Sequence, residues 1–318
     1  MARLASPSPE SRAPTSSAPP NLIQSRPVKP VIAALAALIC VATVAANPID
    51  QKGIEYGRPG GHPLLLDLHV PDGPGPFPAA ILVHGGGFDG GSRDRNMAPT
   101  FQPLADAGFA WFSIDYRMAP EFRFPEARED IDAAIKWVKA NARTYRVDAA
   151  KIVLAGESAG GFLVNYAATH ATPETNVAAV VDIYGPVDYE TLARQRQAYP
   201  ARFNMASINS HQKTGGGIWF FGVEGYDEAS FVKLRAISPL FAVHKGMPPF
   251  LAIHGTRDDQ VPYEQSTLLC DAMRKVAVPC DIITVEAGGH GMGSWKDADQ
   301  QHYKAGMIAW LKKTLHVK

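Results

Sequence analysis

Cysteine is scarce in this sequence of 318 residues, which contains only Cys40, Cys270 and Cys280. No cysteine pair, and no cysteine and histidine, stands at the spacing of a metal-binding motif, so the cysteines predict no metal site. Cys270 and Cys280 lie near each other in the chain. We expect them to be two small apolar residues of a core; the alternative is a disulfide, which an exported protein could form.

An excess of charge of either sign is also missing. Lys and Arg total 31, Asp and Glu total 31, and the formal net charge is +0. Binding to nucleic acid or another polyanion requires a basic surface, so this balance argues against such partners. Hydrophobic residues make up 46% of the chain, which is enough for a globular core. The length suits one α/β domain with additions, or two small domains.

The N-terminal region has little from which to build a core. Residues 1–30 are rich in proline, serine and alanine and contain one acidic residue, Glu10, so we expect a disordered, basic leader. Residues 31–46 are almost wholly apolar, short for a membrane span, and typical of the hydrophobic part of a signal peptide. We expect export, to the periplasm or the medium, with cleavage near Ala46 and no stable membrane partner afterwards. The alternative is an uncleaved membrane anchor.

A serine between glycines follows a short apolar run. Residues 152–155 read Ile-Val-Leu-Ala, which is typical of a buried strand, and Gly156-Glu157-Ser158-Ala159-Gly160 follows directly. This fits G-x-S-x-G, in which a sharp turn between a strand and a helix exposes the serine hydroxyl. Residues 162–168 are apolar enough to continue as a buried helix. Ser158 is therefore the candidate nucleophile.

A run of glycines after another apolar segment supplies a candidate oxyanion hole. Residues 79–83 predict a buried strand, and His84-Gly85-Gly86-Gly87 follows it. Bare glycine backbone can approach a developing alkoxide and donate N–H groups to it. We expect the donors to be the amides of Gly86, Gly87 and Ala159. His84 is expected to support this loop rather than to act as a general base.

The motifs together resemble a known superfamily. His84-Gly85-Gly86-Gly87, the run Asp115-Tyr116-Arg117-Met118-Ala119-Pro120-Glu121 and Gly156-Glu157-Ser158-Ala159-Gly160-Gly161 look like those of the α/β-hydrolases. Within that superfamily, residues 52–316 resemble hormone-sensitive-lipase-like carboxylesterases and acetylxylan or feruloyl esterase-type hydrolases. The resemblance implies a mostly parallel sheet with helices on both faces over residues 47–318. We expect Asp115 and Arg117 to form buried ion pairs that hold their loop.

The resemblance also assigns the acid of a catalytic triad. The segment 254–262 matches the family's H-G-x-x-D-x-x-V-P pattern, which implies that Asp258, rather than Asp259, is the acid. His290 follows the last predicted strand, residues 281–286, and completes the chain order Ser, Asp, His of this fold. His254 is expected to pack at the end of its strand.

Residues 188–236 break the alternation of strands and helices, and we expect them to form a lid over the site. Trp219, Phe220 and Phe221 either line the substrate pocket or attach the lid to the body of the protein. Gly215-Gly216-Gly217 is expected to be a loop tip, with a hinge as the alternative.

These residues predict a hydrolase that acts through an acyl-enzyme. Ser158 attacks an ester carbonyl, His290 transfers the proton, and Asp258 orients His290. This chemistry requires no metal and no organic cofactor. The resemblance implies short-chain esters, among them acetyl or feruloyl groups on polysaccharide, as small-molecule or polymer-linked substrates. The alternatives are an amidase or peptidase on the same triad and a non-catalytic binding protein.

Overall fold

The computed structural model describes residues 47–317. The predicted leader, the predicted signal segment with its cleavage point at Ala46, and Cys40 lie outside the described residues. Among the residues described, none of the helices has both the length and the apolar character that a membrane span needs.

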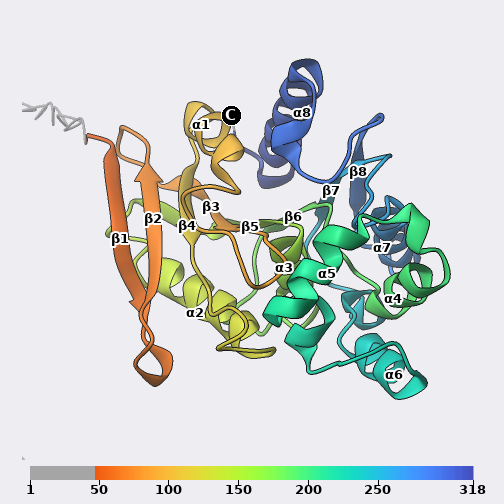
Figure 1. Cartoon of the computed structure of the whole chain (residues 1–318). Coiled ribbons are helices and arrows are strands. Elements are labelled where there is room, and N and C mark those ends of the chain that lie inside the picture. The colour runs from red at the N-terminus through yellow and green to blue at the C-terminus, as the bar shows by residue number, and fades with distance from the viewer. Residues whose placement is uncertain (1–46, 318) are drawn as a thin grey trace, which may run out of the picture. The chain divides into compact units, whose positions relative to one another are not determined.

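The centre of the described region is one sheet of eight strands in the order β1-β2-β4-β3-β5-β6-β7-β8 (Figure 1). The strands are β1 (Ile49–Gly57), β2 (Leu64–Val70), β3 (Phe77–Val83), β4 (Ala110–Ile114), β5 (Val147–Glu157), β6 (Ala179–Ile183), β7 (Phe250–Gly255) and β8 (Cys280–Val285). The pairs β1–β2 and β2–β4 are antiparallel, and the five other pairs, from β4–β3 to β7–β8, are parallel. The predicted mostly parallel sheet is confirmed.

Helices cover both faces of this sheet. They are α1 (Ala98–Asp106), α2 (Glu126–Ala140), α3 (Ala159–Thr169), α4 (Tyr189–Ala198), α5 (Met205–Thr214), α6 (Glu228–Ala236), α7 (Glu264–Lys275) and α8 (Asp297–Leu315). Short 3-10 helices span Pro59–Gly61, Pro200–Arg202, Gly217–Phe221, Pro239–Ala242 and Met292–Ser294. Helices α1 and α8 lie together above the sheet in Figure 1, and α2 lies on the other side.

The core divides into two clusters, one on each face of the sheet. Along β3, Ile81 and Val83 belong to the cluster that α2, α3 and α7 cover, whereas Ala80 and Leu82 belong to the cluster that α1 and α8 cover. Side chains alternate between faces along a strand, so a strand that is apolar at every position must be covered on both sides. The continuous apolar runs of the sequence therefore reflect this three-layer arrangement.

Most strands lie where the sequence predicts them. The structure confirms the strands predicted at 79–83 and 281–286 as β3 and β8, and it extends the strand predicted at 152–155 into β5. The sequence pattern predicts neither β1 nor α7. In β1 the alternation of apolar residues is weak, because Gly53 interrupts it and most of its side chains are exposed or half-buried.

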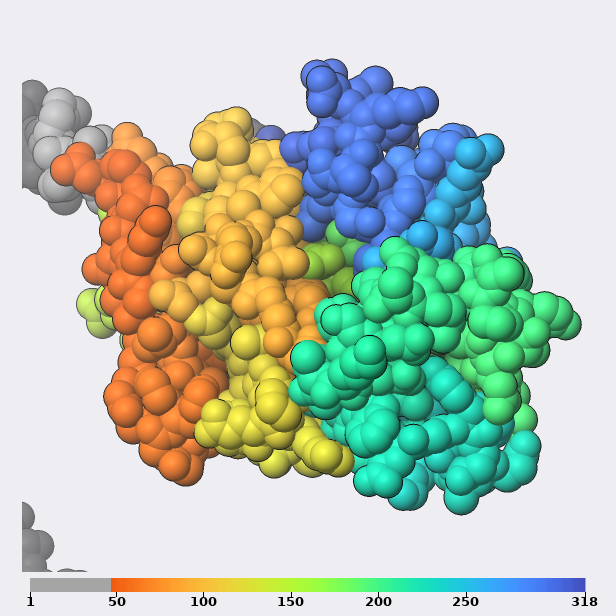
Figure 2. All heavy atoms as spheres, viewed as in Figure 1, coloured from red at the N-terminus to blue at the C-terminus, as the bar shows by residue number. Residues whose placement is uncertain are grey.

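The segment predicted as a lid lies between β6 and β7 and contains α4, α5 and α6. Figure 2 shows this green-to-cyan segment beside the orange-to-yellow part of the molecule, with a hollow between them. Phe220 is fully buried and stacks on Phe88 with ring centroids 4.4 Å apart, and Phe221 lies 5.1 Å from Phe162. Of the two interpretations of this aromatic run, attachment of the segment to the body is the one that the structure supports.

The glycine run at 215–217 is not a loop tip. The amide of Gly217 donates to the carbonyl oxygen of Gly87 at 2.9 Å, and a Cβ on Gly216 would collide with Gly87 and Asp89. The expectation of a loop tip is therefore wrong: these glycines let two backbones pack closely together.

The expectation that Cys270 and Cys280 are separate thiols is also wrong. The structure joins them in a disulfide, with their Cα atoms 5.1 Å apart. Cys270 lies on α7 and Cys280 begins β8. Because α7 brings the two residues face to face, the pairing depends on a helix that the sequence pattern does not predict.

Candidate active site

The candidate nucleophile stands on a strained turn between β5 and α3. Ser158 has φ 53° and ψ −117°, an unfavourable conformation for a residue with a side chain. A Cβ on Gly156 would collide with the backbone of Gly160, and a Cβ on Gly160 would collide with the backbone of Val83. The glycines of G-x-S-x-G are therefore required by close packing of strand, turn and helix. This packing holds the serine hydroxyl above the edge of the sheet.

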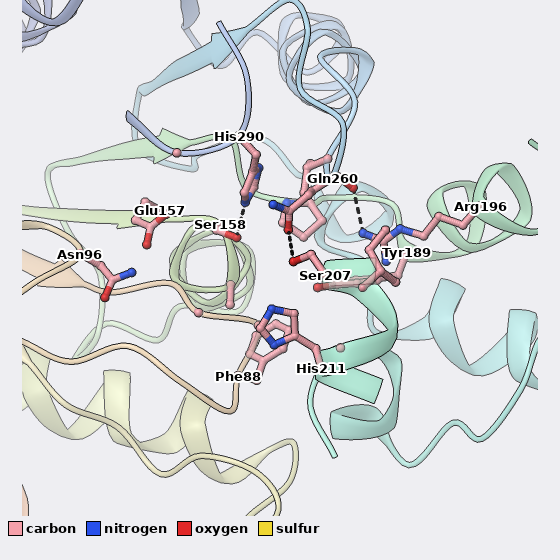
Figure 3. Close-up of a pocket in the computed structure, with 18 residues that line it drawn as sticks. Phe88, Asn96, Glu157, Ser158, Tyr189, Arg196, Ser207, His211, Gln260 and His290 are labelled. Atoms are coloured by element: carbon pink, nitrogen blue, oxygen red, sulfur yellow. Dashed lines mark hydrogen bonds between the residues drawn. The ribbon is translucent and has the colours of Figure 1, made fainter. Parts of the chain in front are cut away.

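The three predicted side chains meet at this turn, and Figure 3 shows two of them, His290 beside Ser158. Ser158 Oγ lies 2.9 Å from Nε2 of His290, and Nδ1 of His290 lies 2.7 Å from Oδ2 of Asp258. Since Asp258 accepts at Nδ1, the proton of a neutral His290 is on Nδ1 and Nε2 is free to accept the serine proton. The order of contacts is that of a nucleophile, a general base and an orienting acid.

Asp258 is held in its ionised form. Burial alone would raise its pKa, but hydrogen bonds from His254 and His290 keep the pKa of this carboxyl well below its usual value. Its other oxygen, Oδ1, accepts from the backbone amides of Gln260 at 2.9 Å and Val261 at 2.8 Å. The carboxylate is therefore both oriented and charged when His290 becomes protonated.

His254 does more than pack at the end of β7. It is fully buried, as predicted, with Nδ1 2.7 Å from Ser266 Oγ and Nε2 2.9 Å from the carbonyl oxygen of Val261. A carbonyl oxygen only accepts, so Nε2 carries a proton. This nitrogen is also 3.4 Å from Oδ2 of Asp258. His254 thus helps to hold Asp258 in place, a role that the sequence pattern around His254 did not predict.

The glycine loop after β3 presents unused donors. Gly86 and Gly87 have φ values of 113° and 64°, and both line the cavity with Ala159. Within the described residues, the amides of these three residues donate no hydrogen bond to the protein. Free, converging N–H groups beside a nucleophile suit a developing oxyanion.

Two buried side chains fix the position of this loop. Glu157 accepts from the amide of Gly85 at 2.8 Å, and burial raises the pKa of its carboxyl. The carbonyl oxygen of His84 accepts from the hydroxyl of Tyr116 at 3.0 Å, and the two rings stack 4.4 Å apart. The predicted supporting role of His84 is confirmed. The role of Glu157 was missed, although its place beside Ser158 in the motif was a signal.

The expected ion pairs are also present. Arg117 pairs with the buried Asp130 at 2.8 Å, and Asp115 pairs with Arg93 at a half-buried position. These contacts hold the loop after β4 and leave its charged groups away from the cavity lining.

A cavity of about 270 Å³ opens beside the serine. The predicted lid contributes Ser207, Ile208 and His211 from α5 and Tyr189 and Arg196 from α4. Within residues 47–317, no group of three histidine, cysteine, aspartate or glutamate side chains is arranged to hold a metal ion.

A comparison of the sequence with known protein families agrees with this geometry. The BD-FAE family model matches residues 66–273. The chain belongs to the BD-FAE family. Its sheet and helices are those of the α/β-hydrolase fold that this family shares.

Two curated relatives of this BD-FAE member come from Mycobacterium tuberculosis. Esterase LipC is 33% identical over 267 residues and esterase LipQ is 29% identical over 238 residues. The alignments cover 80% and 71% of this chain but only 62% and 53% of the two relatives. The chain thus spans less than two thirds of either relative.

Two solved structures have a similar fold. A carbohydrate esterase from gut microbiota is 25% identical, has a TM-score of 0.66, and is matched over 84% of this chain and 96% of its own. Esterase 2 of Thermogutta terrifontis, solved after phosphoramylation by tabun, is 20% identical with a TM-score of 0.64, over 84% and 95% of the two chains.

Proposed function

We propose that this chain is a serine hydrolase that cleaves carboxylic esters through an acyl-enzyme. The observation that carries the proposal is the unbroken set of contacts from Asp258 through His290 to Ser158, beside free backbone amides. Similarity to esterases LipC and LipQ supports ester cleavage.

The geometry supports a two-step mechanism. Ser158 Oγ attacks the ester carbonyl while Nε2 of His290 takes its proton, and the amides of Gly86, Gly87 and Ala159 bind the oxyanion. His290 then protonates the leaving alcohol, and the acyl group remains on Ser158. Water repeats the sequence, with His290 as the base, and releases the acid.

The first test is hydrolysis of p-nitrophenyl acetate, butyrate and decanoate by the full chain and by Ser158→Ala. We expect activity that decreases with acyl length, because the cavity is small, and a loss of roughly 10⁴- to 10⁶-fold in kcat in the variant. Ser210→Ala, an exposed serine on α5, is the matched control and is expected to keep full activity. Undiminished activity in Ser158→Ala would remove the proposal.

The amidase or peptidase alternative uses the same triad. Matched ester and amide substrates with one acyl group distinguish the two reactions. A kcat/KM for the amide equal to or above that for the ester would favour the alternative.

We further propose acetyl or feruloyl groups on polysaccharide as the natural esters. The support is the similarity to a carbohydrate esterase and the small cavity. Acetate release from acetylated xylan is the measurement. Good activity on simple esters without any release of acetate or ferulate from polysaccharide would contradict this substrate class.

Export of the chain remains a proposal. The disulfide between Cys270 and Cys280 supports it, because disulfides persist mainly in oxidising compartments. N-terminal sequencing of the mature protein tests cleavage near Ala46, and an intact Met1 would favour the anchored alternative.

A further inference from the structure

One arginine in the cavity has no acidic partner. Arg196 lies on α4, lines the cavity that contains Ser158, and is only 8% exposed. Figure 3 shows its side chain beside Tyr189, on the opposite side of the pocket from Glu157 and Asn96. The catalytic mechanism described above makes no use of this charge.

The hydrogen bonds of Arg196 are incomplete. Its Nη2 donates to the carbonyl oxygen of Gln260 at 2.8 Å, and its Nε is shielded from solvent without a partner. No carboxylate of residues 47–317 lies within 4.0 Å of the guanidinium. The carboxylate of Asp258 already accepts from His290 at 2.7 Å. Most of its five N–H donors therefore remain unused.

Arg117 shows what a buried arginine in this protein normally has. It is also 8% exposed, but it pairs with Asp130 at 2.8 Å and with Glu129 at 3.2 Å. A buried guanidinium without such a counter-charge is costly, and burial lowers the pKa of Arg196. A carboxylate is the group that its planar donors fit best, through two parallel hydrogen bonds.

We propose that Arg196 binds a carboxylate carried by the substrate, so that the preferred esters have a second, free acid group. This inference rests on the proposed ester hydrolysis and names the substrate class of the same site. Tyr189 lines the cavity beside Arg196 and can give the carboxylate a further hydroxyl donor.

The alternative is a purely structural role, in which Arg196 only holds the loop that carries Asp258. Its bond to Gln260 ties α4 to the residues next to Asp258. Loss of such a structural contact would lower the activity on all esters equally. Loss of a carboxylate site would lower the activity on charged esters more than on neutral esters of the same shape.

Two pairs of esters distinguish these roles and locate the acid group. Methyl hydrogen glutarate carries the carboxylate in its acyl half, and methyl 5-methylhexanoate is its neutral counterpart. The anion of 4-acetoxybutanoic acid carries the carboxylate in its alcohol half, and 4-methylpentyl acetate is its neutral counterpart. We expect a higher kcat/KM for the charged ester of at least one pair, and that pair identifies the half that reaches Arg196.

The variants are Arg196→Met, Arg196→Lys and the control Arg194→Met. In Arg196→Met the charged-to-neutral ratio of kcat/KM is expected to fall about 10- to 100-fold, the value of a hydrogen bond to a charged group. Arg196→Lys should restore part of the ratio. Arg194 lies on the exposed side of the same helix, paired with Glu190 and Glu228, so its variant should keep the wild-type ratio.

Calorimetry separates this inference from the reaction itself. Ser158→Ala should bind the charged ester more tightly than the neutral one, and the added Arg196→Met change should remove the difference. If the wild type hydrolyses no ester but this binding difference is present, the proposed function fails and the carboxylate site stands. Equal kcat/KM for charged and neutral esters in the wild type, or a ratio that survives in Arg196→Met, would overturn the site.

Discussion

Two of the helices that border the cavity, α3 and α5, differ sharply in how deeply they are buried. In α3, which carries the turn of Ser158, ten of the eleven residues are buried, whereas in α5 only Ile208 is buried. Helix α3 also packs against β5 and β6 of the central sheet. The nucleophile therefore stands on a closely packed part of the protein, and part of the opposite wall stands on a weakly buried helix.

This difference separates the residues that carry out the reaction from the residues that bind the remainder of the substrate. Groups that stabilise a transition state must be held in place before the reaction, which a close-packed core provides. Groups that recognise the remainder of a substrate can lie on segments with lower local stability.

The largest effect is expected at the acid that the core holds. Asp258→Asn keeps the size of the side chain but favours the wrong tautomer of His290, so kcat should fall roughly 10⁴-fold. Ester hydrolysis across the pH range is the measurement. Asp259→Asn is the matched control, because Asp259 is the exposed neighbour and its variant should keep near-normal activity. A larger loss in Asp259→Asn would transfer the role to that residue.

The triad was predictable because its geometry depends on local backbone. A serine on a strand-to-helix turn, and an acid and a histidine after later parallel strands, must reach the same edge of the sheet. Ser158 followed from its motif, His290 from its place after the last strand, and Asp258 from the family resemblance. The help that Asp258 receives from His254 was not predictable, since it depends on how the loop after β7 folds back over that strand.

The second prediction concerns the oxyanion loop. Gly86 has a φ of 113°, and an alanine there would place its Cβ against the backbone of Gly90. The loop must then move, and its amides no longer point at the oxyanion. Loss of one such donor typically lowers kcat about 10²- to 10³-fold. Gly90→Ala is the control in the same loop, because the nearest atom to its new Cβ is 3.5 Å away. Equal losses in the two variants would show a general disturbance of the loop.

The third prediction tests the core below the nucleophile. Asp182 is fully buried in β6, and burial raises the pKa of its carboxyl to about 6. The folded protein therefore binds this proton more tightly than the unfolded chain does. The resulting stability is complete near pH 4 and is lost as the pH rises through about 6, on the order of 2–3 kcal/mol.

Asp182→Asn should remove this pH dependence, because the amide oxygen can still accept from the amide of Gly185. Relative to the wild type, the variant should gain stability between pH 4.5 and pH 7.5 in thermal unfolding. Asp72→Asn, at an exposed position, should show no such change. Parallel pH profiles for the wild type and Asp182→Asn would contradict the prediction.

Side-chain positions were least predictable in the predicted lid. A break in the βα alternation at residues 188–236 marked the segment in the sequence, but the place of each side chain was not predictable. Phe220 and Arg196 are both buried, yet one packs on Phe88 and the other faces the cavity. Neither outcome follows from local pattern, because both depend on contacts with strand ends far away in the chain. The disulfide between Cys270 and Cys280 was not the expected outcome, because it too depends on how a helix packs against a strand.

The smallest effect is expected at Ile208, which is both the buried residue of α5 and part of the cavity wall. Ile208→Val removes one methylene group and should weaken the attachment of α5 by roughly 1 kcal/mol. Because α5 has no other buried side chain, we expect it to open locally while the sheet stays closed. Hydrogen exchange should then rise in residues 205–214 and stay unchanged in β5 and α3. Ile135→Val, on the buried face of α2, is the control: it should lower the unfolding temperature without raising exchange in α5. If exchange rose equally in α3 and α5 after Ile208→Val, the two walls of the cavity would open together. The division between a fixed wall that carries the nucleophile and an adaptable wall that binds the rest of the substrate would then not hold.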